Sequence, residues 1–128
     1  KFVVISIGMN DITSGKSLII FKKNLIKLEY ILSKKFSVNH FIYSGMPPVH
    51  KLKTVPNPLK SILAIKALIF DKFLRLKCER NINYIYININ KLSFEENMVA
   101  KDGFHPSENF YKIWSEEISN IIKKEENY

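Results

Sequence analysis

Three short apolar runs, separated by longer amphipathic segments, limit what this chain can fold into. The runs span residues 2–7, 39–44 and 84–88 and are rich in the β-branched and aromatic residues of buried strands. After them, near residues 17–35, 58–78 and 107–123, apolar residues recur at spacings of three and four, which predicts helices. Strands that alternate with helices form parallel sheets through right-handed crossovers. The pattern therefore predicts an α/β fold, a three-layer α/β/α sandwich around a parallel sheet.

Size and composition suit one partial domain, residues 1–128. Apolar residues make up 46% of the chain and charged residues 25%, and no apolar run approaches the roughly 20 residues that span a bilayer. Cys78 is the sole cysteine, so no internal disulfide can form. Because three strands make a thin sheet and Lys1 stands where a complete chain has Met, we expect N-terminal strands and any signal peptide upstream. Without such a peptide, a soluble cytoplasmic protein is the default, and its oligomeric state stays open.

The net charge of +8 raises the question of a nucleic-acid partner. The basic residues are scattered, however, and they alternate with apolar residues at helical spacing, as on the solvated faces of packed helices. No Lys or Arg cluster is expected to be interleaved with exposed aromatic residues. We therefore interpret the charge as a solubility feature, with general attraction to anions as the lesser alternative, and we expect neither a nucleic-acid partner nor a membrane span.

An acid and an imidazole stand three residues apart in the segment 102–107, Asp-Gly-Phe-His-Pro-Ser. A buried carboxylate beside an imidazole can fix the tautomer of the ring and stabilise its protonated form. Asp102 and His105 are thus candidates for an orienting acid and a general base. A surface loop before a helix explains the same residues, with Pro106 in the first turn and Ser107 as the cap. A metal site would need His40 or His50, whose spacing is not that of metal ligands, so we expect no metal and no cofactor.

A phosphate-binding loop is a second hypothesis, because Gly15-Lys16-Ser17 follows a predicted strand and precedes a helix. The spacing does not fit, since Gly8 leaves six residues before Gly15 instead of four. No later strand ends in an Asp that could bind magnesium. An ordinary helix start explains these residues better than a nucleotide site does.

Asn10 is a third candidate, because an amide after a strand can donate a hydrogen bond to a developing oxyanion. It can also be an ordinary turn residue. Residues 4–11 (Val-Ile-Ser-Ile-Gly-Met-Asn-Asp) resemble the Gly-x-Asn-Asp segment of the SGNH (GDSL-type) hydrolase family, and residues 102–107 resemble its Asp-x-x-His segment. Residues 44–48 and 56–59 are similar to loops of bacterial members. The resemblance runs through almost the whole chain in the right order, and it implies the flavodoxin-like fold of that family.

The resemblance implies hydrolysis of a small-molecule ester through an acyl-serine. In that scheme His105 is the general base, Asp102 orients it and Asn10 donates to the oxyanion, while Asp11 braces its loop. The family's nucleophile lies in a Gly-Asp-Ser segment, and a glycine farther on supplies a second oxyanion donor. This chain lacks both of these segments.

No serine of the chain stands in a glycine-framed turn, and no Gly-x-Ser-x-Gly elbow occurs. We place Ser6 within a strand, Ser14 and Ser17 at a helix start, and Ser44 before the proline-rich loop. The chain is therefore expected to be inactive alone, either as part of a larger esterase or as a catalytically dead remnant. If it were active, Ser44 would be the first serine to substitute.

Overall fold

A computed structural model describes residues 1–92 and 96–127. It contains three strands, four α-helices and three short 3₁₀ helices. In chain order the elements are β1 (Phe2–Ile5), α1 (Met9–Thr13), α2 (Leu18–Phe36), β2 (His40–Ser44), η1 (Val49–Lys51), α3 (Leu59–Glu79), β3 (Tyr84–Ile87), η2 (Ile89–Lys91), η3 (Glu96–Met98) and α4 (Glu108–Glu126). The strands form one parallel sheet in the order β1-β2-β3, which confirms the predicted fold class.

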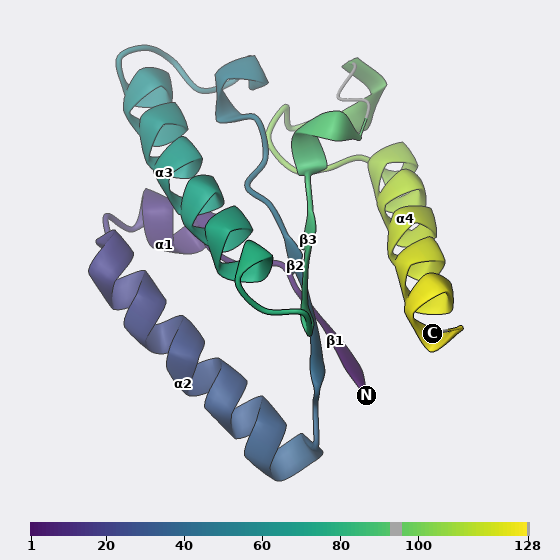
Figure 1. Ribbon diagram of the computed structural model, residues 1–128. Helices are drawn as coiled ribbons and strands as arrows, with labels where there is room; N and C mark the ends of the chain where they lie inside the picture. Colours follow the sequence, from purple (N-terminus) through teal and green to yellow (C-terminus); the bar gives the residue numbers. More distant parts are fainter. Residues whose placement is uncertain (93–95, 128) are drawn as a thin grey trace.

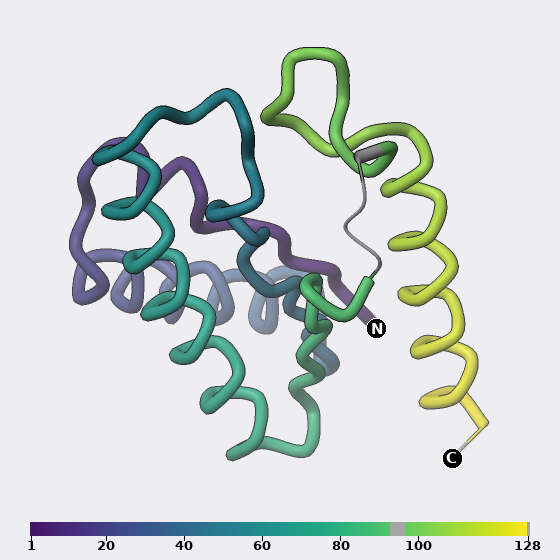
Figure 2. Tube along the Cα trace, turned by 90° about the horizontal axis from the view of Figure 1, so that it is seen from above, coloured from purple at the N-terminus to yellow at the C-terminus, as the bar shows by residue number. Residues whose placement is uncertain are grey.

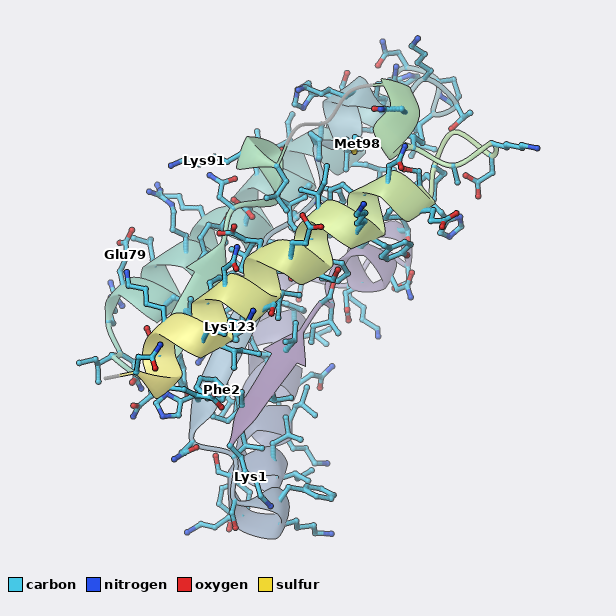
Figure 3. All side chains as sticks on the ribbon, turned by 90° about the vertical axis from the view of Figure 1, so that its right-hand side faces the viewer. Lys1, Phe2, Glu79, Lys91, Met98 and Lys123 are labelled. Carbon is cyan, nitrogen blue, oxygen red and sulfur yellow. The ribbon has the colours of Figure 1, made fainter. Side chains whose placement is uncertain are left out.

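The sheet lies between two helical layers, with α2 and α3 on one face and α4 on the other (Figure 1). Successive side chains of a strand point to opposite faces, and β2 shows this clearly. Phe41 and Tyr43 pack in the cluster beneath α2 and α3, whereas Ile42 packs in the cluster beneath α4. In Figure 3, Met98 lies at the N-terminal end of α4 and Phe2 near its C-terminal end, and both belong to this second cluster.

The three long helices begin and end within three residues of their predicted positions because each has an apolar stripe that repeats at helical spacing. In α3 this stripe consists of Leu63, Ala67, Phe70, Leu74 and Cys78. Ser107 caps α4 as predicted, since its Oγ accepts a hydrogen bond from the Phe110 amide at 3.2 Å.

Two details differ from the sequence-based expectation. Residues 9–13 form the short helix α1, although we expected a loop there. Pro106 does not lie in the first turn of α4 but precedes its cap, where it pairs with Val99 in an isolated antiparallel bridge. The bridge ties the start of α4 to the residues before the Asp102–His105 turn.

A buried carboxylate joins the two helices on one face to the sheet. Glu29 of α2 accepts hydrogen bonds from the Tyr43 hydroxyl, from Lys77 Nζ at 3.0 Å and from the Tyr84 hydroxyl at 3.3 Å. Burial and the nearby Glu29 carboxylate raise the pKa of Tyr43 and of Tyr84. This cluster holds α2, α3 and the sheet together.

Candidate active site

A tight turn between η3 and α4 carries the predicted acid and base. The Ala100 amide donates to the His105 carbonyl at 2.7 Å, and the Ser107 amide donates to the Met98 carbonyl at 2.9 Å. Gly103 turns the chain with a φ of +70°, a conformation that glycine adopts without strain. These backbone bonds fix residues 98–107 as a hairpin-like turn at the carboxyl end of the sheet.

Within this turn the structure brings Asp102 and His105 together. Asp102 Oδ2 lies 2.5 Å from His105 Nδ1, and Oδ1 accepts hydrogen bonds from the amides of Phe104 and His105 at 2.9 and 3.0 Å. The bond to the His105 ring and those two amide bonds lower the pKa of Asp102 to about 2. The carboxylate therefore engages Nδ1 and leaves Nε2 as the ring nitrogen that can exchange a proton with a substrate.

The carboxylate is not buried, contrary to the expectation from the sequence. The side chain of Asp102 is 50% exposed and that of His105 is 70% exposed. The pair lies three positions apart on a sharp turn at the surface, and the amides of this turn hydrogen-bond to the carboxylate without burying it. The ring is consequently oriented by local bonds and stays open to solvent.

Thr54, for which no sequence pattern predicted a role, holds this turn in place. Its hydroxyl donates to the Gly103 carbonyl at 2.9 Å from the loop between β2 and α3. The contact is so close that a Cβ on Gly103 would collide with the Thr54 methyl group. The β2–α3 loop therefore positions the turn that carries Asp102 and His105.

Asn10 lies in α1, immediately after β1, and its side chain is exposed. It lines a depression of about 220 Å³ together with Ser6, Asp11, Met46 and neighbouring residues. The side-chain amide of Asn10 makes no hydrogen bond within residues 1–92 and 96–127, so this group is available to a ligand. Gly8 permits this arrangement, because its φ is +123° and a Cβ there would collide with Met46.

A partly buried hydrogen-bond network holds the far wall of this depression. The Met46 amide donates to Asp71 Oδ1 at 2.8 Å, and the Tyr86 hydroxyl lies 2.7 Å from both oxygens of the same carboxylate. Burial and this carboxylate raise the pKa of Tyr86. Asp71, 25 residues from Met46 along the chain, was not selected from the sequence.

Asp11 braces the loop through its ion pair with Lys16, whose Nζ lies 3.3 Å from Asp11 Oδ1. Ser17 caps α2 by accepting the Ile20 amide at 3.3 Å. Lys16 and Ser17 are thus both occupied at an ordinary helix start, which argues against the phosphate-loop hypothesis.

Helix α1, which carries Asn10, and the turn that carries His105 both lie at the carboxyl edge of the sheet (Figure 1). Viewed from this edge in Figure 2, α1 lies on the side of α2 and α3, and the turn at residues 98–107 lies on the side of α4. No hydrogen bond in the described part of the chain joins Asn10 to Asp102 or His105. Their convergence on one substrate stays a prediction.

His40 and His50 do not join the candidate site. His40 stacks on Phe2 in the sheet with ring centroids 4.8 Å apart, and His50 lies on η1. Within residues 1–92 and 96–127, no group of three or more His, Cys, Asp or Glu side chains is placed to hold a metal ion.

Residues 1–118 match the family model of the GDSL-like lipases and acylhydrolases. The chain belongs to this family. No curated protein matches the sequence. Membership confirms the resemblance stated above and supports an esterase or acylhydrolase type of function, with small-molecule esters as substrates. No described helix has the length and apolar character needed to span a bilayer.

A GDSL-like hydrolase needs a nucleophilic serine, and the described serines have other contacts or positions. Ser44 is only 2% exposed, and its Oγ accepts the Trp114 indole N–H at 3.0 Å. Ser107 caps α4 and donates to the Asn97 carbonyl at 2.6 Å. Ser6 lies just beyond β1, not within it, and lines the Asn10 depression. No hydrogen bond joins a described serine hydroxyl to His105, and Ser93 lies outside the described residues.

Proposed function

We propose that this GDSL-like chain supplies the base, the orienting acid and one oxyanion donor of an ester hydrolase that acts through an acyl-serine. The contact between His105 Nδ1 and Asp102 Oδ2 at 2.5 Å carries the proposal. It leaves Nε2 unbonded on a ring that is 70% exposed at the carboxyl edge of the sheet, where active-site loops of such folds gather.

In this mechanism His105 Nε2 accepts the hydroxyl proton of a serine as the serine oxygen bonds to the ester carbonyl carbon. The carbonyl oxygen becomes an oxyanion, to which the Asn10 amide donates a hydrogen bond. The protonated ring, stabilised by the Asp102 carboxylate, then gives its proton to the departing alkoxide, and an alcohol leaves. Water repeats the sequence on the acyl-serine and releases the carboxylic acid.

We further propose that the nucleophile comes from a Gly-Asp-Ser segment outside residues 1–128, so that these residues alone are inactive. Ser44 is buried and hydrogen-bonded, which supports this view. It is therefore no longer the first candidate for the nucleophile. Ser6, exposed beside Asn10, and Ser93 are the serines of the chain that require a direct test. A catalytically dead remnant is the alternative outcome.

The test measures hydrolysis of a short-chain aryl ester. Residues 1–128 should be no faster than their His105→Ala variant. Joining an upstream segment that carries Gly-Asp-Ser should produce activity, which His105→Ala then lowers by roughly four to six orders of magnitude. His50→Ala, a loss of an exposed histidine outside the turn, is the matched control and should leave the rate unchanged. Asn10→Ala should cost less, roughly 10²–10³ in turnover, because other donors remain.

Each outcome decides between the alternatives. His105-dependent activity from residues 1–128 alone, abolished by Ser6→Ala or Ser93→Ala, would show that the chain holds its own nucleophile. If His105→Ala left the rate of ester hydrolysis by the upstream-extended protein unchanged, the hydrolase mechanism would be overturned. An extended protein that stays inactive would favour the dead remnant.

A further inference from the structure

The outward face of α3 is unusually apolar for a surface helix. While Leu63, Ala67 and Phe70 face the sheet, the opposite side presents Ile62, Ile65, Leu68 and Ile69, each between 49% and 64% exposed. We call these four residues the α3 stripe. A surface helix normally carries polar residues on this side, and contiguous exposed apolar side chains mark an interaction surface.

The α3 stripe leads into a basic groove between α2 and α3. The groove has a volume of about 640 Å³, and its lining includes Ile69 of the stripe, Phe73, and the cations Lys22, Lys72, Lys77 and Arg80. No Asp or Glu lines it. Apolar and cationic side chains therefore form one continuous surface.

The charges in this groove are largely uncompensated. Lys77 bonds to Glu29 at 3.0 Å, and Lys22 Nζ lies 4.7 Å above the Phe73 ring. Lys22, Lys72 and Arg80 have no carboxylate partner among the described residues. The two acids of α3 are engaged elsewhere, Asp71 with Tyr86 and the Met46 amide, and Glu79 with Arg75 at 3.8 Å.

We propose that the α3 stripe and the basic groove together dock on the surface of an anionic lipid bilayer. Aliphatic side chains can enter the acyl boundary while lysine and arginine heads remain among the lipid phosphates, which is how interfacial helices bind membranes. A nucleic acid would match the cations but not the exposed aliphatic residues of the stripe. The net charge of +8 favours approach to such a surface.

Docking in this way would leave the candidate active site accessible. The N-terminal end of α3 lies at the same edge of the sheet as the turn that carries His105 (Figure 1). A bilayer along the outer face of α3 would therefore lie beside this edge. The inference stands on α2 and α3 alone and does not require the chain to be a hydrolase.

Vesicle co-sedimentation tests the electrostatic part. The chain should bind vesicles of equal phosphatidylcholine and phosphatidylglycerol, and bind vesicles of phosphatidylcholine alone at least tenfold more weakly. Lys72→Gln/Arg80→Gln should weaken binding to the anionic vesicles by about 25-fold, roughly fivefold for each cation at the surface. Lys123→Gln/Lys124→Gln removes the same charge from α4, on the other side of the sheet, and should weaken binding less than threefold.

The apolar part has its own variants. Ile65→Ser/Leu68→Ser should weaken binding more than tenfold, because two inserted side chains lose their apolar contacts. Ile82→Ser, which removes a 92% exposed residue outside the stripe, should have no effect. Circular dichroism of every variant checks that the fold is intact, and all the positions are at the surface.

Several outcomes would overturn the proposal. Equal losses from the two charge variants would mean diffuse attraction without a docking face. Unchanged binding by Ile65→Ser/Leu68→Ser would show that the α3 stripe does not contribute to docking. Absence of sedimentation with the anionic vesicles, or tighter binding to soluble polyglutamate than to the vesicles, would rule out a bilayer as the partner.

Discussion

The pKa of Asp102 offers a direct test of the acid–base pair that needs no catalytic activity. Three hydrogen bonds lower this pKa from 3.8 to about 2, and the bond to the His105 ring is the largest contribution. His105→Ala removes that bond but keeps the two backbone amides on Oδ1. The pKa of Asp102 in this variant should rise well above 2 and stay below 3.8.

Carbon-detected NMR titration of the Asp102 carboxyl between pH 1.5 and 6 measures this shift. The sign follows from the lowered pKa: the carboxylate stabilises the folded turn above pH 3.8, and this contribution is lost as the pH falls toward 2. His50→Ala is the matched control and should leave the Asp102 pKa unchanged. An Asp102 that titrates near 3.8 in the unsubstituted chain, or near 2 in His105→Ala, would refute the proposed pairing.

Two further substitutions test the contacts that hold the fold around the site, and both are measured by urea unfolding. Gly45→Ala should destabilise the chain by about 1–3 kcal/mol, because its methyl group would lie 2.6 Å from Asp71 Oδ1; an unchanged midpoint would contradict this. Glu29→Leu should cost about 3–5 kcal/mol, because it leaves the largely buried Lys77 without its partner. The exposed Glu79→Leu should cost no more than about 0.5 kcal/mol, and equal losses at the two positions would argue against a structural role for Glu29.

The strands could be predicted from short runs rich in β-branched and aromatic residues, and the long helices from apolar spacings that repeat over several turns. Each predicted strand contains the observed one, with at most two extra residues at an end. Helix α1 was missed because its five residues are too few to show a period, and it begins after a glycine with no side-chain cap. The wrong position of Pro106 has a similar cause, since its bridge to Val99 depends on a turn that the sequence does not display.

The site shows the same division between local and distant contacts. Asp102 and His105 are three residues apart, so their proximity could be expected from spacing alone. The bond from Thr54 to Gly103 joins residues 49 positions apart, and no pattern in either segment predicts it. The burial of Ser44 could not be expected for the same reason, because Trp114, whose indole N–H bonds to the Ser44 hydroxyl, lies 70 positions away.

One loop connects both halves of the candidate site, and this connection explains why several of its residues are buried. The loop between β2 and α3 begins with Gly45 and Met46, which line the Asn10 depression, and continues to Thr54, which holds the Asp102–His105 turn. Between these ends Val49 and Leu52 are almost fully buried, and Asp71 fixes the Met46 amide. A loop anchored in this way cannot shift one half of the site without straining the other. If Asn10 and His105 act on one ester, this loop sets the distance between them, and Thr54 and Asp71 are positioning residues that act through it.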